Sequence, residues 1–282
     1  MTGHQHIKAV SPGELGPARA LAHATSQLLT KAARANLDVA PDDSHSNLGW
    51  DSAAQRFASQ ALPGANGEVY VGLSLVPFDL MLIDSATGTS TYPLTGHTLA
   101  EALTWLDDAL ESVALKPASA VALPYELPAD VSEVSKIPDA LPLGLEPLAD
   151  WFDMADRAFR ELAADQSEQN PGPSPVRCWP HHFDIATYVS LEAGDPETAK
   201  GIGVGMSPGD ETYAQPYFYV NPWPHLDLAG LPNAPHPGHW HTQGFVGAIA
   251  TGDDVLSTDD TEKALSSFLK NAFAIGHTLL MK

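Results

Sequence analysis

The sequence has a single cysteine, few basic residues and no long apolar run. Cys178 is the only cysteine in 282 residues. One chain therefore forms neither an internal disulfide nor a zinc site made of several thiolates. We expect Cys178 to be a small buried residue in a strand; the alternative is a nucleophile that depends on the nearby His181.

Basic residues are scarce relative to acidic ones. Lys and Arg number 14 and Asp and Glu 35, which gives a net charge of -21. This charge repels phosphate backbones and anionic lipid surfaces, so we expect neither a nucleic-acid nor a membrane partner. No stretch approaches the ~20 apolar residues of a membrane helix, and the N-terminus "MTGHQHIKAV" lacks the apolar core of a secretory signal. We expect a soluble cytoplasmic protein, and the sequence does not indicate its oligomeric state.

Hydrophobic periodicity predicts both helices and strands. Apolar residues recur at helical spacing over residues 17–37, 99–113, 147–165 and 260–275. Short runs that favour strands cover residues 68–84, 90–94, 176–191, 201–207, 216–223 and 239–250, with a turn at 84–88. We therefore predict an α+β fold of mostly antiparallel sheet, with the apolar stripes of the helices at 99–113, 148–162 and 262–275 facing one shared sheet.

The polar, proline-rich segment "QSEQNPGPSPV" predicts a boundary between two lobes, residues 1–166 and 167–282. Trp50, "VGLS" at 71–74 and the helix after it match Trp179, "VGMS" at 204–207 and the last helix. The match suggests an internal duplication. The alternative is one continuous domain without duplication.

Two strand motifs resemble a known family. "SPVRCWPHHFDIATYV" and "PYFYVNPWP" are similar to the W…FD[LI]A and PxFYxY strands of an uncharacterised family of bacterial domains of unknown function. The resemblance implies a related fold and no established activity. It covers Phe183 and Asp184 better than the adjacent His181 and His182.

Histidines are the strongest chemical signal, since half of the twelve lie between residues 181 and 241. His239 and His241 are two residues apart, so on a strand they project to the same side and can chelate one ion. If residues 176–191 form a continuous strand, His182 and Asp184 share its polar side and His181 lies on the apolar side. A bulge after Pro180 would reverse that order.

These patterns predict a metal site, with zinc as the first ion to test. The expected ligands are His181, His182, Asp184, His239 and His241. The expected function is a metal-dependent hydrolase or related lyase acting on a small polar substrate, with Glu211 or Asp184 accepting the proton of a bound water. The sequence "GMSPG" does not support an esterase, because Pro208 has no N–H to bind an oxyanion after Ser207.

Two alternatives remain open. Aromatic residues near the histidines could line a site for a sugar-like or other small polar ligand in a non-catalytic binding protein. The residues of that site would be Trp179, Tyr217, Tyr219, Trp223 and Trp240. In the other alternative the protein is a structural or interaction module, and its histidines are ordinary surface groups.

Overall fold

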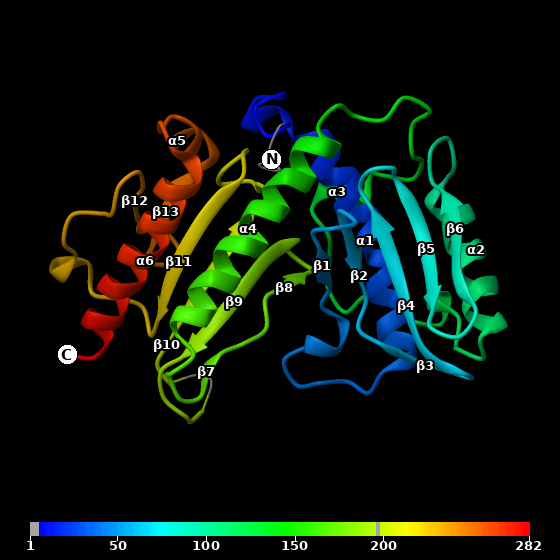
Figure 1. Ribbon diagram of the computed structural model, residues 1–282, viewed down its shortest axis with the longest axis horizontal. Helices are drawn as coiled ribbons and strands as arrows, with labels where there is room; N and C mark the ends of the chain where they lie inside the picture. The colour runs from blue at the N-terminus through cyan, green and yellow to red at the C-terminus, as the bar shows by residue number, and fades with distance from the viewer. Residues whose placement is uncertain (1–5, 196–197) are drawn as a thin grey trace. The chain divides into compact units, whose positions relative to one another are not determined.

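The computed structural model describes residues 6–195 and 198–282, and the chain divides into two compact units (Figure 1). The first unit contains residues 6–10, 14–153 and 177–183, and the second contains residues 11–13, 154–176 and the described part of 184–282. Each unit has its own antiparallel sheet and its own helices. The predicted α+β class is confirmed.

The division of the chain differs from the predicted one. Helix α4 (Leu145–Asp165) contributes to both units, and the boundary lies inside it, between Asp153 and Met154. The segment 177–183 belongs to the first unit. The predicted boundary at 166/167 followed the proline-rich linker, but packing partners, which a linker composition does not reveal, decide which residues cluster together.

The first unit is built on a six-stranded sheet in the order β1-β2-β4-β5-β6, with β3 paired to β4. Alternate residues of β4, such as Val69, Val71 and Leu73, are buried, as a sheet with one covered side requires. The predicted turn at 84–88 is present, because the Asp84 carboxylate accepts hydrogen bonds from Ala86 N and Thr87 Oγ1. The strands are β1 (Gly49–Asp51), β2 (Arg56–Ala58), β3 (Leu62–Gly64), β4 (Gly67–Ser74), β5 (Asp79–Asp84) and β6 (Gly88–Pro93).

Helices α1 (Gly16–Asn36) and α2 (Leu99–Ser112) pack on this sheet. α2 begins at a capping box, in which Thr98 Oγ1 accepts from Glu101 N and the Glu101 carboxylate accepts from Thr98 N. Short elements complete the unit: the 3-10 turns η2 (Ser44–Ser46) and η3 (Ala118–Ala120), helix α3 (Ala129–Ser132) and strand β8 (Arg177–Trp179), which bridges Leu48 through Cys178.

The second unit has a sheet whose strands follow the order β12-β13-β11-β10-β9-β7. Helix α6 packs on β10 and β11, and Phe159 of α4 packs on Phe218 of β11 with ring centroids 6.1 Å apart. The elements are η1 (Pro12–Glu14), which begins in this unit, β7 (Gly172–Pro173), β9 (Asp184–Ser190), β10 (Gly201–Ser207), β11 (Tyr217–Trp223), η4 (Leu228–Gly230), β12 (His239–His241), β13 (Gly247–Thr251), α5 (Gly252–Leu256) and α6 (Thr261–Leu280).

The expectation of one shared sheet is wrong, because α2 packs on the first sheet and α6 on the second. Each amphipathic stripe still finds a burial partner, and Leu265, Phe268 and Leu269 of α6 are buried. Both units contain four neighbouring antiparallel strands in chain order followed by a helix: β2-β4-β5-β6 before α2, and β9-β10-β11-β13 before α5 and α6. This shared order agrees with a duplication, which stays a prediction.

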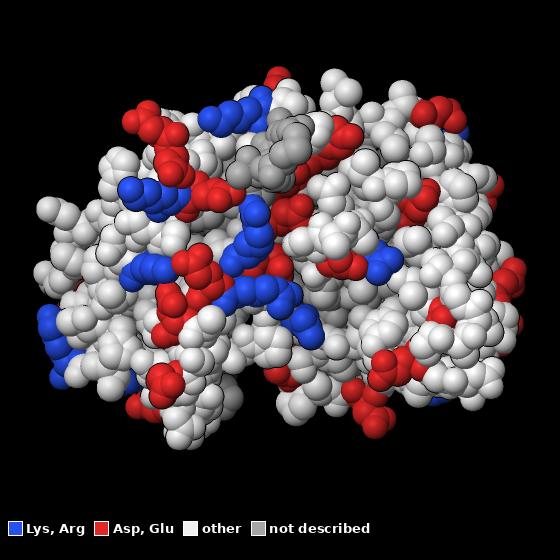
Figure 2. Space-filling view, in the orientation of Figure 1, with Lys and Arg blue, Asp and Glu red and all other residues white. Residues whose placement is uncertain are grey.

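Charged side chains are spread over the surface. Acidic side chains are scattered across the face visible in Figure 2. In the second unit Lys270 of α6 pairs with Glu161 and Asp165 of α4 at 2.7 and 3.0 Å. Pairs this exposed contribute little to stability. None of the helices in the described ranges has the length and apolar character needed to cross a membrane.

The segment "WPHHFD" is a turn, so the predicted continuous strand 176–191 is wrong. Residues 180–183 separate β8 from β9, and Phe183 has a left-handed backbone (φ 61°) with a fully buried ring. Pro180 has no N–H to continue a sheet ladder. Its carbonyl instead accepts hydrogen bonds from His23 Nε2 and Gln27 Nε2 of α1, both at 2.8 Å. The His23 ring also stacks on Phe183 at 5.0 Å.

Burial of His23 predicts a loss of stability in acid. Burial lowers the pKa of His23 from 6.5 to about 4. Between these values the unfolded chain binds a proton that the folded chain does not, so stability falls as the pH drops through this window, by about 3 kcal/mol in all. Urea unfolding of wild type and His23→Gln at several pH values measures this contribution. The carboxylates titrate in both proteins and affect both alike. An identical pH dependence of the free energy of unfolding in the two proteins would therefore contradict the contribution assigned to His23.

Candidate functional site

The two sides of the second sheet differ in chemistry. One side carries Ile202, Val204, Met206 and Phe218, all fully buried, and it is the side on which α6 packs, since Gly276 lies against Ile202 and Pro222. Residues paired across an antiparallel sheet point to the same side. By the observed register the other side, here called the tyrosine face, carries Asp184, Ala186 and Tyr188 of β9, Gly201, Gly203 and Gly205 of β10, Tyr217, Tyr219, Asn221 and Trp223 of β11, Ile249 of β13 and His239 and His241 of β12.

Strand β10 presents only backbone on the tyrosine face between Gly201 and Gly205. A Cβ at Gly205 would overlap the ring of Tyr219, and a Cβ at Gly201 would overlap the ring of Tyr188. Both rings therefore lie directly against the strand. At Gly203, between them, a Cβ would meet its nearest neighbours, Asn221 O and Tyr188 Cδ2, at 3.7 and 3.9 Å, which is ordinary contact. Gly201 and Gly205 thus each hold an aromatic ring, and Gly203 has no covering ring.

Two tyrosines of β11 donate hydrogen bonds to carboxylates. The Tyr219 hydroxyl reaches Asp184 Oδ2 at 2.5 Å, across the glycines of β10. The Tyr217 hydroxyl donates to Asp210 Oδ2 at 2.6 Å. Burial raises the pKa of Tyr217, and the hydrogen bond to Asp210 raises it further. The Tyr217 phenol is therefore a donor at neutral pH.

His239 and His241 share one side of β12, as the sequence predicts, and both contact the hydroxyl of Tyr213. The distances from Tyr213 Oη are 3.1 Å to His239 Nε2 and 3.0 Å to His241 Nδ1. His241 Nε2 lies 2.5 Å from the carbonyl of Gln243, which can only accept. His241 Nε2 therefore carries the proton, His241 Nδ1 accepts from the Tyr213 hydroxyl, and Tyr213 Oη accepts from His239 Nε2–H.

The predicted metal ligands are not brought to one point. Asp184 is on β9 and the histidine pair on β12, with β10, β11 and β13 between them. Four spacings of about 4.8 Å separate the two strands by roughly 19 Å, so one ion cannot bind both. Across residues 6–195 and 198–282, no group of three or more His, Cys, Asp or Glu could hold a metal ion.

The remaining predicted site residues are spread over the chain. His181 and His182 lie in the turn after β8, and His182 is exposed. The expected pairing of His182 with Asp184 on one strand face is wrong, because β9 begins only at Asp184. Glu211 is exposed in the connection between β10 and β11.

Of the predicted aromatic residues, Tyr217, Tyr219 and Trp223 lie on the tyrosine face. Trp240 alternates to the other side of β12, where its Nε1 donates to Pro232 O at 2.8 Å. Trp179 is in β8 of the first unit. The prediction of one aromatic site holding all five residues is therefore wrong for Trp240, and for Trp179 it stays a prediction.

Sequence reasoning did not identify Asn221 as a site residue. Asn221 lies on β11 opposite Gly203. Its Oδ1 is buried, and nothing in the described part of the chain donates a hydrogen bond to it. A buried acceptor without a donor costs free energy, and ligand sites are a common place for such atoms. The alternation of polar residues along Tyr217, Tyr219 and Asn221 was the available signal.

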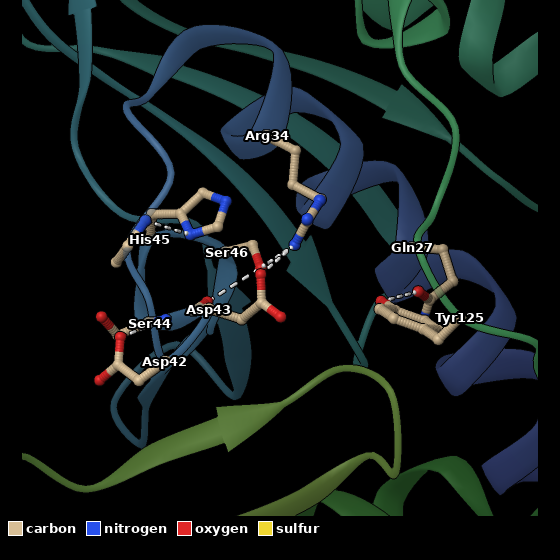
Figure 3. A network of polar contacts seen from close by, with 9 residues as sticks. Gln27, Arg34, Asp42, Asp43, Ser44, His45, Ser46 and Tyr125 are labelled. Atoms are coloured by element: carbon tan, nitrogen blue, oxygen red, sulfur yellow. Dashed lines mark hydrogen bonds and ion pairs between the residues drawn. The ribbon is translucent and has the colours of Figure 1, made fainter.

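A second polar network lies in the first unit (Figure 3). Arg34 of α1 donates to Asp43 and Ser46 at 2.8 and 3.2 Å, and Gln27 of the same helix accepts from the Tyr125 hydroxyl at 2.8 Å. Burial raises the pKa of Tyr125, which keeps its phenol protonated. These bonds join α1 to two loops, so we interpret the network as structural.

No protein-family model, curated protein or solved structure matches the chain. The resemblance of the two strand motifs to a family of unknown function therefore stays a prediction.

The glycines of β10 predict opposite effects of the same small substitution. Gly205→Ala places a methyl group in the ring of Tyr219, and we expect it to destabilise the protein by about 1–3 kcal/mol through overpacking and loss of the bond to Asp184. Gly203→Ala meets only ordinary contacts and should cost less than about 1 kcal/mol. Urea unfolding and near-ultraviolet circular dichroism of both variants test this. Equal stability of the two variants would show that Tyr219 does not depend on Gly205.

Proposed function

We propose that the second unit binds a small polar ligand with a sugar-like ring, on the tyrosine face over Gly203. The observation that carries this proposal is the buried Asn221 Oδ1, which lacks a donor within the described structure. A hydroxyl or N–H of a ligand would supply the missing hydrogen-bond donor. The free energy of that bond is favourable because the acceptor is already removed from water.

The surroundings of Gly203 suit a ring that has an apolar side. Tyr188 and Tyr219 lie against the neighbouring glycines, so aromatic side chains flank Gly203 on both sides. Sugar-like rings combine an apolar side with hydroxyl groups around the edge. The apolar side would contact the Gly203 backbone and the tyrosines, and an edge hydroxyl would donate to Asn221.

The second candidate is the metal-dependent hydrolase or lyase predicted from the sequence, with zinc at the histidines. His239 and His241 favour it, because they point toward the same atom. Asp184 is less suited to act as its base, since it lies on β9 and already accepts from Tyr219. We rank ligand binding first, because Asn221 Oδ1 is a buried acceptor to which no residue of the described ranges donates.

Gly203→Ala tests the proposal with the fold intact. A panel of monosaccharides and nucleosides is screened by thermal shift, and hits are measured by isothermal titration calorimetry. We expect at least one sugar-like ligand to stabilise wild type. Gly203→Ala should weaken its binding at least tenfold, since the methyl group occupies the contact surface.

Gly230→Ala is the matched control, because a Cβ at Gly230 meets nothing within 4 Å. It should bind like wild type. A panel without a single binder, or a Gly203→Ala protein with wild-type affinity, would contradict the proposal.

A further inference from the structure

The Tyr213 hydroxyl and the two histidines of β12 form a compact group of three possible metal ligands. Tyr213 Oη lies 3.1 Å from His239 Nε2 and 3.0 Å from His241 Nδ1. In a tetrahedral site with bonds of 2.0–2.1 Å, neighbouring ligand atoms are about 3.3 Å apart. The observed separations are close to that value, so small side-chain movements would admit an ion between the three atoms.

His241 has the second hydrogen bond that metal-binding histidines usually make. Its Nε2–H donates to the Gln243 carbonyl, which fixes Nδ1 as the ring atom with a lone pair. A metal-ligating histidine typically donates its other ring N–H to a carbonyl or carboxylate in this way. The ring of Phe245 packs against His241 with centroids 4.4 Å apart and further restricts its orientation.

Tyr213 is also held in place before any ion arrives. Its backbone N donates to Asp210 Oδ1 at 2.9 Å, and its carbonyl accepts from Asp210 N at 2.8 Å. Burial, and then the nearby carboxylates of Asp210 and Asp254, raise the pKa of the Tyr213 phenol, so the phenol keeps its proton until an ion displaces it. The negative charge of these carboxylates, in a chain with a net charge of -21, attracts cations.

We infer that Tyr213, His239 and His241 bind a divalent transition-metal ion through phenolate Oη, Nε2 and Nδ1. The ion forms a bond to the phenol oxygen and releases its proton to solvent. His239 moves its own proton from Nε2 to Nδ1, which changes no net charge. Cu²⁺ is the divalent ion of the first transition row that nitrogen and oxygen sites generally bind most tightly, so it serves as the probe, and the spacing of the three atoms also suits tetrahedral Zn²⁺. This site does not rest on the proposed ligand surface over Gly203.

The phenolate gives the site an optical signature that ordinary surface histidines lack. Full-length protein without a histidine tag is titrated with CuCl₂ at about pH 8, where unperturbed histidines are neutral. We expect one ion per chain, a phenolate-to-copper charge-transfer band and release of one proton per ion. Titration with ZnCl₂ should release the same proton and compete with copper.

Three variants and a matched control test the ligands. Tyr213→Phe should lose the band and the proton release, and its copper affinity should fall at least tenfold. His239→Gln and His241→Gln should each lower the affinity at least tenfold. His236→Gln, an exposed histidine three residues before His239, should behave like wild type. Circular dichroism verifies that each variant is folded.

The inference is overturned if copper-loaded wild-type protein lacks the charge-transfer band. It is also overturned if the band persists in Tyr213→Phe. Copper affinity that is unchanged in both His239→Gln and His241→Gln would assign the bound ion to other residues.

Discussion

The second unit depends on the absence of side chains on one side of β10. Gly201, Gly203 and Gly205 leave bare backbone there, and the rings of Tyr188 and Tyr219 fill two of the three positions. Any larger residue at Gly205 would displace Tyr219, whose hydroxyl reaches over β10 to Asp184. A single strand thus sets the positions of aromatic rings that originate on both neighbouring strands.

The other side of the same strand has the opposite role. Ile202, Val204 and Met206 are fully buried, and α6 packs on this side of the sheet. Burial of these residues stabilises the unit from this side. The tyrosine face carries polar groups, including tyrosine–carboxylate bonds and an amide oxygen, Asn221 Oδ1, to which no described residue donates. Buried polar groups cost free energy unless they are hydrogen-bonded. Their presence on one face is therefore the basis for placing function there.

In the first unit, buried polar groups have a structural role. His23 and Gln27 of α1 both donate to the carbonyl of Pro180, and Phe183 packs among Phe57, Phe152 and His23. The "WPHHFD" segment is thereby fixed as a turn. Its two histidines lie in this turn.

The sequence by itself determined the local elements. Helical periodicity located α1, α2, α4 and α6, since an apolar stripe needs a burial partner whichever sheet supplies it. The alternation within "HWH" correctly put His239 and His241 on one side of β12, because that depends only on two residues of extended backbone. The alternation of side chains along β11 is equally local, and it correctly predicted that Tyr217 and Tyr219 lie on one side of the strand.

The tertiary structure decided which residues from distant segments of the chain lie close together. Only strand order separates Asp184 from the histidines, because three other strands lie between β9 and β12. The interruption of the strand at Pro180 depends on donors from α1, more than 150 residues earlier in the chain. Asn221 and Gly203 became candidates only through their register, since no sequence spacing shows which residue lies opposite another across a sheet.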